Sequence, residues 1–288
     1  MRTQLRSNSP AVSNAAHRLP LPTPSPLPED SPDFVQSLAR GLEVIRAFDA
    51  DHPELSQAQI AERTGLARAV VRRSLITLQH LGYVGARGRQ FHLMPRILEL
   101  GFGYLSASRL PELALPTMEQ LVRSVQESCS MSVLDGDQIV YVARVPVSRI
   151  MTIALGVGAR LPAFAASMGR ILLAGLSDTQ LDAWLRRADL HPITPHTLCQ
   201  PKPLKAEILK IRRQGFALVS RELEIGLFSV AVPIRNRRGD VLAALNVSMQ
   251  FHNDSKRVAT RIMLPALRKA QVEIERILAH VGSPLGSH

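Results

Sequence analysis

Residues 63–96 read RTGLARAVVRRSLITLQHLGYVGARGRQFHLMPR. The charge of this stretch has one sign, because it holds seven arginines and neither aspartate nor glutamate. Its apolar residues have helical spacing at first and alternate after Gly82. A solvated basic helix and an anion-binding surface both fit the charge alone. The choice between them therefore depends on the local structure that the residues predict.

The first half of the stretch predicts a helix-turn-helix. Ser56 with Gln59 three residues later is a capping-box pattern that opens one helix. Gly65 accepts the positive φ that a tight turn requires, and a second helix is expected to start near Ala67. The inward face of this second helix is expected to consist of Val71, Ser74, Leu75 and Leu78.

The second half predicts a basic hairpin. The residues YVGARGRQFHL alternate in polarity, with Arg87 and Gly88 at the expected tip. Helix, turn, helix and hairpin together predict a winged helix-turn-helix, whose second helix inserts its N-terminal half into the major groove. Arginine there can bind guanine or phosphate. We therefore predict double-stranded operator DNA as a partner, contacted by Arg68, Ala69, Arg72, Arg73, Arg87 and Arg89.

Composition divides the rest of the chain. Residues 1–32 carry seven prolines and are expected to form a disordered arm. The winged-helix domain is expected over 33–94, a linker helix over 95–110, and an α+β domain of mixed helices and strands over 111–282. In the first helix of the winged-helix domain, the apolar residues at helical spacing are Val35, Leu38, Leu42, Ile45 and Phe48.

Length, composition and net charge limit the class of protein. The chain has 288 residues, 45% of them hydrophobic, and a formal net charge of +11, which favours nucleic acid, acidic membranes or acidic partners. Cys129 and Cys199 form no CxxC motif, which is typical of a reducing cytoplasm. No apolar run is long enough to span a bilayer, and the N-terminus lacks the apolar segment of a secretory signal. A cytoplasmic protein without membrane contact is expected.

Longer motifs resemble a known family. SLARGLEVIRAFDA, FHLMPRILELGFGYLS, RIMTIALGVGARLPAFAASMGRILLAGL and GLFSVAVPIRN followed by VLAALNVS resemble, in order and spacing, the IclR family of bacterial transcriptional regulators. The resemblance covers about residues 34–280 and is closest to the PcaR, PcaU and PobR branch. It implies a winged-helix domain, a linker helix and a GAF-like effector-binding domain, assembled as a homodimer or homotetramer. It also implies control of aromatic-acid catabolism by protocatechuate, 4-hydroxybenzoate or β-ketoadipate.

The resemblance also implies an effector pocket. Its residues in this chain are Ile150, Ile153, Ser167, Met168, Leu227, Ser229, Asn246 and Ser248. The side chains of these residues would form an apolar wall with a few hydroxyl and amide groups. A helix N-terminus near Ser167 could hold a carboxylate. Many members carry an acid where this chain has Val219 or Ser220, so a pocket without negative charge is expected. For Arg144 and Arg149 a surface role is favoured over a ligand contact. Ordinary core packing is the alternative for each position.

An enzyme is the main alternative class. In that case the chain would process small molecules in the cytoplasm and carry a basic DNA-binding or partner-binding domain. No Ser–His–Asp, Cys–His or paired-carboxylate spacing stands out, so no catalytic residue is predicted. His191, His196 and Cys199 lie close together, but no second pair of metal ligands is near them. We predict no enzymatic activity, cofactor or metal.

Overall fold

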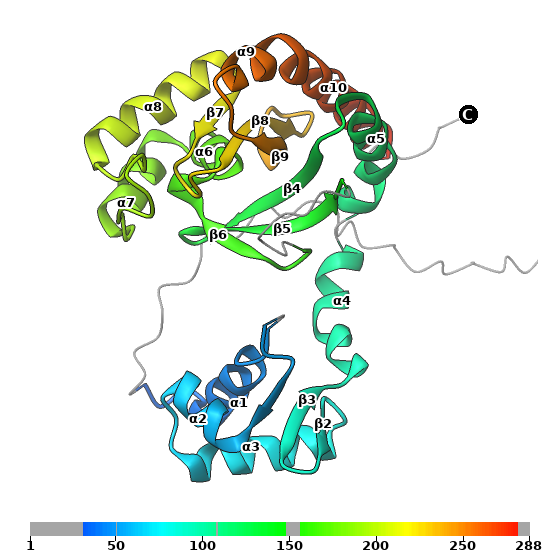
Figure 1. Cartoon of the computed structure of the whole chain (residues 1–288), viewed down its shortest axis with the longest axis vertical. Coiled ribbons are helices and arrows are strands. Elements are labelled where there is room, and N and C mark those ends of the chain that lie inside the picture. The colour runs from blue at the N-terminus through cyan, green and yellow to red at the C-terminus, as the bar shows by residue number, and fades with distance from the viewer. Residues whose placement is uncertain (1–30, 50, 108, 148–155, 282–288) are drawn as a thin grey trace, which may run out of the picture.

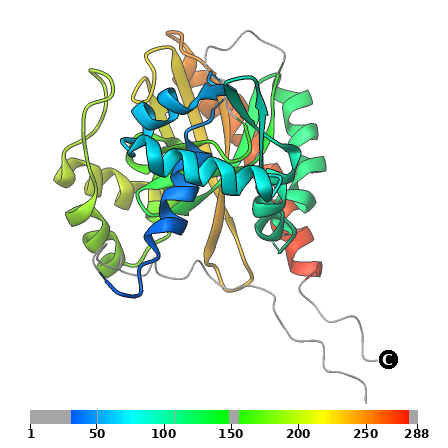
Figure 2. The same cartoon turned by 90° about the horizontal axis from the view of Figure 1, so that it is seen from below.

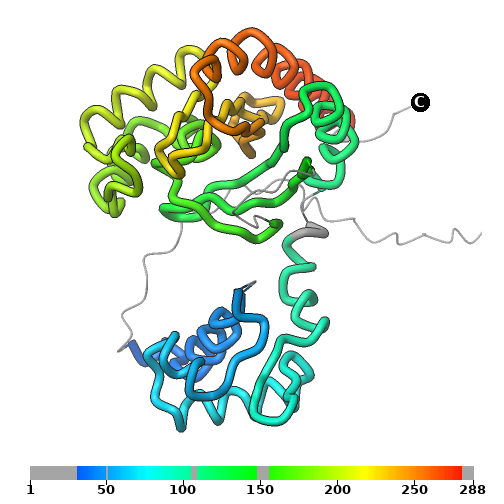
Figure 3. Tube along the Cα trace, in the orientation of Figure 1, coloured from blue at the N-terminus to red at the C-terminus, as the bar shows by residue number. Residues whose placement is uncertain are grey.

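The computed structural model describes residues 31–49, 51–107, 109–147 and 156–281, and within these the side chains of 105–107 and 281 are left aside. The chain forms a smaller N-terminal unit and a larger C-terminal unit, with helix α4 (Leu98–Ala107) running between them (Figures 1 and 3). Both units mix helices with antiparallel strands, which confirms the predicted α+β class.

The smaller unit has the predicted winged helix-turn-helix elements and one further strand. Strand β1 pairs with β3, so the wing becomes a three-stranded antiparallel sheet in the order β1-β3-β2. The elements are α1 (Gln36–Arg46), β1 (Glu54–Ser56), α2 (Gln57–Thr64), α3 (Arg68–His80), β2 (Val84–Arg87) and β3 (Gln90–Leu93).

Local signals fix the helix-turn-helix as expected. The Ser56 side chain accepts a hydrogen bond from the backbone N–H of Gln59, and the Gln59 side chain accepts one from the backbone N–H of Ser56, so the capping box is confirmed. Gly65 ends α2 with φ of 70°, a conformation that favours glycine. The apolar inward face of α3 is also confirmed, since the buried residues of this helix are Val71, Leu75 and Leu78.

Helix α1 buries only some of its apolar residues. Val35, Leu38 and Leu42 are 59%, 62% and 48% exposed, whereas Val44 and Ala47 are buried in the core of the smaller unit. The helix is confirmed, but helical spacing alone did not show which of its apolar residues are buried. The face that packs against α3 includes Val44. The other face is left as an exposed apolar row.

The larger unit is built on a six-stranded antiparallel sheet in the order β6-β5-β4-β9-β8-β7. Helices lie on both sides of it (Figure 1). The strands are β4 (Ser128–Asp135), β5 (Gln138–Val145), β6 (Arg160–Pro162), β7 (Ala217–Ser220), β8 (Leu227–Arg235) and β9 (Val241–Gln250). The helices are α5 (Leu110–Val125), α6 (Ser167–Ala174), α7 (Asp178–Arg187), α8 (Pro201–Gln214), α9 (Ser255–Val258) and α10 (Leu264–Val281). A 3₁₀ turn, η2 (Ala163–Ala165), precedes α6, and a π-helical turn, η3 (Ala259–Met263), precedes α10.

The two faces of the sheet differ in chemistry. Alternate residues of β4, such as Cys129 and Met131, pack with α5 and α10 in one apolar core. The residues that alternate with them, Ser128 and Ser130, pair with Ser248 and Asn246 of β9 on the opposite face. That face is covered in part by α6 and contributes to a second core with α7 and α8. A row of hydroxyl and amide groups therefore lies between the sheet and α6.

Candidate functional site

The α3 surface carries the predicted DNA-contacting residues. Arg68, Ala69, Arg72 and Arg73 are all exposed, and α3 lies across the front of the molecule when it is seen from below (Figure 2). Helix α3 has no acidic residue, and none of its three arginines forms an ion pair with the described part of the chain. The surface is therefore basic and open to solvent, as phosphate binding requires.

The wing holds the remaining basic residues. Gly88 has φ of 62° at the tip of the β2–β3 hairpin, and Arg87 and Arg89 on either side of it are exposed. The Arg87 Nη1 atom lies 3.3 Å from Oε1 of Glu54 on β1, which is an acid outside residues 63–96. The Arg87 side chain is 81% exposed. A pair this exposed contributes at most about 1 kcal/mol, so it leaves Arg87 available to another anion.

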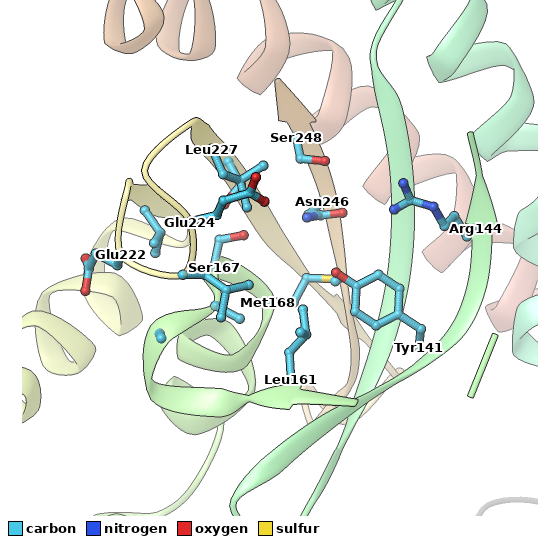
Figure 4. Close-up of a pocket in the computed structure, with 15 residues that line it drawn as sticks. Tyr141, Arg144, Leu161, Ser167, Met168, Glu222, Glu224, Leu227, Asn246 and Ser248 are labelled. Atoms are coloured by element: carbon cyan, nitrogen blue, oxygen red, sulfur yellow. The ribbon is translucent and has the colours of Figure 1, made fainter. Parts of the chain in front are cut away.

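A cavity lies between the polar face of the sheet, the start of α6 and the loop that enters β8 (Figure 4). The space between these walls, its open mouth included, measures about 590 Å³. Its lining consists of Tyr141, Arg144, Leu161, Ala165, Ala166, Ser167, Met168, Val219, Glu222, Leu223, Glu224, Leu227, Ser229, Asn246 and Ser248.

The structure brings most of the expected effector residues together. Six of the eight line this cavity, namely Ser167, Met168, Leu227, Ser229, Asn246 and Ser248. Ser229 pairs directly with Ser248 across β8 and β9, and Asn246 lies two residues along β9 on the same face. The other two, Ile150 and Ile153, fall in 148–155, outside the residues that the structure describes, as does Arg149.

Arg144 lines the cavity, so the surface role favoured for it was wrong. Its Nη1 atom donates to Ser130 Oγ at 3.1 Å, and the Ser130 backbone N–H donates to Asn246 Oδ1 at 3.1 Å. With its oxygen engaged, the Asn246 amide keeps its N–H groups for a ligand. Among the described residues no carboxylate forms an ion pair with Arg144. This guanidinium can therefore bind the carboxylate of a ligand.

Tyr141 is a lining residue that sequence reasoning missed. Its side chain is 5% exposed, and burial raises its pKa to about 12, although the charge of Arg144 opposes the shift. The hydroxyl group therefore stays protonated at neutral pH. In Figure 4 it lies beside Met168 and points into the cavity. It can donate a hydrogen bond to an oxygen atom of a ligand.

The cavity also contains negative charge, contrary to the expectation drawn from Val219 and Ser220. Glu222 and Glu224 follow β7 and reach the lining from the loop. Both oxygens of Glu222 accept hydrogen bonds from Arg170, at 2.8 Å and 2.5 Å, and the Leu198 backbone N–H donates to one of them at 2.7 Å. Glu222 thus lies two residues beyond Ser220, and Arg170 neutralises its charge within the protein.

Helix α6 points its N-terminus at the same cavity. Its first residues, Ser167 and Met168, are in the lining, and the capping residue Ala166 supplies no side-chain acceptor for the first backbone N–H groups. Unsatisfied N–H groups at a helix start favour an anion. The helix terminus and Arg144 are therefore two positive features that border one cavity.

The described residues form neither a metal site nor a membrane-spanning helix. They contain no group of three or more His, Cys, Asp or Glu side chains arranged to hold a metal ion. No helix in this part of the chain is both long enough and apolar enough to cross a membrane.

Comparison with known proteins gave consistent matches along the chain. Residues 37–88 match the family model described as the IclR helix-turn-helix domain, and 102–276 match that of the bacterial transcriptional regulator IclR C-terminal region. The chain is 46% identical over 244 residues to the Pca regulon regulatory protein of Pseudomonas putida, and the match covers 84% of each protein.

Two solved structures extend the comparison. A transcriptional regulator from Rhodococcus sp. RHA1 is 49% identical, with a TM-score of 0.76 over 86% of this chain and 100% of that one. An IclR homologue from Microbacterium hydrocarbonoxydans, solved in complex with 4-hydroxybenzoate, is 27% identical, with a TM-score of 0.73 over 84% of this chain and 98% of that one.

Proposed function

This chain belongs to the IclR family of bacterial transcriptional regulators, and we propose that it controls genes of aromatic-acid catabolism in the cytoplasm. In this proposal, α3 and the wing bind operator DNA, and a small aromatic acid in the cavity controls that binding. The similarity to the Pca regulon regulatory protein supports the pathway, and the 4-hydroxybenzoate complex of a relative supports the ligand class.

One observation carries the ligand class. Arg144 borders an otherwise mostly apolar cavity, is oriented by Ser130 and lacks a carboxylate partner among the described residues. A carboxylate of the effector supplies that partner. The flat body of an aromatic acid then packs against apolar lining residues such as Met168 and Leu227. A short oxo-acid such as glyoxylate offers the same carboxylate but much less surface to bury.

We expect effector affinity to depend on the polar lining. Asn246→Ala and Ser248→Ala each remove a neutral hydrogen bond to the effector, which should reduce the binding free energy by about 0.5–1.5 kcal/mol. The loss is larger where a buried polar group is left without a hydrogen-bond partner. Arg144→Gln removes a charge-assisted bond and should cost about 1.5–3 kcal/mol. Calorimetry with 4-hydroxybenzoate should therefore show affinity lowered several-fold to a hundred-fold, with DNA binding in the absence of ligand unchanged.

Arg186→Gln is the matched control for Arg144→Gln, because Arg186 is an exposed arginine of α7 outside the cavity lining. Its affinity for 4-hydroxybenzoate should equal that of the unmodified protein. The cavity assignment is wrong if the three cavity variants titrate like the unmodified protein. The ligand class is wrong if aromatic acids bind no better than glyoxylate. Turnover of these acids would favour the enzyme alternative instead.

We expect the arginines of α3 and of the wing to contribute differently to DNA binding. Arg72→Ala or Arg73→Ala should weaken operator binding by about 1–3 kcal/mol and relax base preference where guanine is the contact. Arg87→Ala should weaken binding to all DNA sequences equally, because it removes a phosphate contact. For the same reason, its DNA affinity should depend less steeply on salt concentration. Fluorescence anisotropy of labelled duplexes over a range of salt concentrations measures both effects.

Arg123→Ala serves as the control for DNA binding, because Arg123 is an exposed residue of α5 in the larger unit. Its salt dependence should match that of the unmodified protein. Unchanged binding in Arg72→Ala, Arg73→Ala and Arg87→Ala would falsify the assignment of α3 as the recognition helix.

The exposed apolar residues support a homo-oligomer. The row of Val35, Leu38 and Leu42 on α1 and the side chains of Leu98 and Leu100 on α4 are all about half exposed or more. We propose that they pack against a second copy of the chain, which would present two α3 helices to a repeated or palindromic site. Leu38→Glu and Leu98→Glu should shift the protein toward monomer in light scattering at micromolar concentration. A strictly monomeric unmodified protein would refute the proposal.

A further inference from the structure

Two charged groups in the cavity beside α6 are left without a partner of opposite charge. Its charged lining residues are Arg144, Glu222 and Glu224. Glu222 is neutralised, because both of its oxygens accept hydrogen bonds from Arg170. Among the described residues, neither Arg144 nor Glu224 forms an ion pair. The charge that the cavity can offer to a ligand is therefore one guanidinium and one carboxylate.

The carboxylate and the guanidinium belong to different walls. Arg144 extends from β5, and Glu224 belongs to the loop between β7 and β8. Figure 4 shows Glu224 on the wall that also carries Ser167 and Leu227, across the cavity from Arg144. Both charged residues are partly exposed, so a ligand can reach them. A ligand that spans the cavity can therefore contact both charges at once.

The loop holds the backbone of Glu224 in place from both sides. Before it, the Arg221 backbone N–H donates to the Leu227 oxygen at 2.7 Å, and the Arg221 guanidinium lies 4.4 Å from the centre of the Phe251 ring. After it, the Phe251 backbone N–H donates to the Gly226 oxygen at 2.7 Å. The Glu224 backbone oxygen itself accepts from the Leu227 N–H at 3.0 Å. The carboxylate therefore extends from a fixed position.

A carboxylate selects ligands by what it accepts and by what it repels. Its oxygen atoms are acceptors only, so Glu224 can bind a hydroxyl group of a ligand. A second carboxylate at the same place would instead meet a like charge, which selects against the ligand that carries it. The carboxylate of the preferred ligand then pairs with Arg144 across the cavity.

We propose that Glu224 makes this cavity selective for aromatic acids that carry one carboxylate and, at the opposite end of the ring, a hydroxyl group. Aromatic dicarboxylic acids are rejected by the charge of Glu224. The inference rests on the proposed function, because it assigns the orientation of the effector in the same cavity. It adds a residue that determines specificity and a class of acids that the protein does not bind well.

Three flat acids that differ at one ring position test this selectivity by calorimetry with the full-length protein. 4-Hydroxybenzoate carries a hydroxyl group opposite its carboxylate, benzoate carries hydrogen there, and terephthalate carries a second carboxylate. Benzoate should bind about tenfold more weakly than 4-hydroxybenzoate, because it lacks the hydrogen bond to a charged group. Terephthalate should bind more weakly still, because its second carboxylate meets Glu224.

Glu224→Gln keeps the size of the side chain and removes its charge. In this variant, the affinity for terephthalate relative to that for benzoate should rise about tenfold or more, because the repulsion is gone. A loop that is merely disturbed would weaken all three acids in the same proportion and leave this ratio unchanged. Glu119→Gln is the matched control, since Glu119 is an exposed acid of α5 outside the cavity lining, and it should keep the selectivity of the unmodified protein.

The selectivity and the proposed function fail in different ways. An unchanged ratio of terephthalate to benzoate affinity in Glu224→Gln would overturn the role of Glu224. Equal affinities of the unmodified protein for 4-hydroxybenzoate and terephthalate would overturn it as well, although aromatic acids would still be effectors. If none of the three acids binds the unmodified protein, the proposed function itself fails and this inference fails with it.

Discussion

Glu222→Leu is expected to lower the free energy of unfolding by about 3–5 kcal/mol, because it leaves the charge of Arg170 buried without a partner. Arg170 is 2% exposed. Its guanidinium donates to both oxygens of Glu222 and, at 2.8 Å, to the Phe164 backbone oxygen. Only the carboxylate neutralises its charge. Urea unfolding followed by circular dichroism measures the loss.

The double variant Arg170→Met/Glu222→Leu distinguishes two contributions to the free energy of unfolding. One is the penalty of an unpaired buried charge, and the other is the stabilisation by the ion pair. Replacing both charges with apolar side chains should cost less than Glu222→Leu alone, since no charge is then left buried. Glu119→Leu is the control, because its pair with Arg123 is exposed and contributes at most about 1 kcal/mol. The argument fails if Glu222→Leu loses no more stability than Glu119→Leu does.

The same ion pair also shapes the cavity beside α6. Arg170 belongs to α6, whose first residues form one wall, and Glu222 belongs to the loop that forms another. Thr197 Oγ1 donates to the Glu222 backbone oxygen at 2.7 Å, so the loop is held at its backbone as well. In a Glu222→Leu protein that still folds, affinity for 4-hydroxybenzoate should therefore fall without any change in Asn246 or Ser248.

The winged helix-turn-helix could be predicted because its signals are local. The Ser56 capping box, the glycine at position 65 and the wing glycine at position 88 lie within a few residues of the structure that they determine. The orientation of α1 could not be predicted in the same way. Both of its faces contain apolar residues, and only tertiary contact with α3 decides that Val44 is buried and Leu38 is not.

The residues that line the cavity beside α6 could be predicted where strand alternation is regular. Asn246 and Ser248 lie two residues apart on β9 and face the same side. Tyr141 and Arg144 are three residues apart, so regular alternation would place them on opposite faces of β5. A register shift between Met131 and Ser132 of β4 brings both to the cavity, because Tyr141 pairs with Ser132 and Arg144 with Ser130. Nothing in the sequence marks that bulge.

Glu222 illustrates a second limit. Its partner Arg170 is 52 residues away in the chain, and neither lies in a motif that indicates the pairing. The family resemblance indicated no acid here, because Val219 and Ser220 occupy the place where many members carry one. Glu222 lies in the loop after β7, two residues beyond Ser220, so the prediction of an uncharged cavity did not include it.

Gly169→Ala is expected to destabilise the larger unit by roughly 3 kcal/mol, at the upper end of the cost of overpacking. A Cβ atom at this position would lie 2.0 Å from the Ala163 backbone oxygen and 2.5 Å from the Ala163 Cα atom. These are backbone atoms, so no rotamer change relieves the overlap, and α6 must move away from η2. The higher helix propensity of alanine, about 1 kcal/mol, acts in the opposite direction and is too small to compensate.

Gly101→Ala is the control for this substitution, because Gly101 lies in α4 and a Cβ atom there would meet nothing within 4 Å. It should leave stability unchanged or raise it slightly through helix propensity. Gly169→Ala should instead unfold at lower urea concentration. It should also bind 4-hydroxybenzoate more weakly, since the displaced start of α6 carries Ser167 and Met168 in the cavity wall. Equal stability of the two alanine variants would mean that η2 and α6 can separate at little cost, and that close contact at Gly169 does not define this wall.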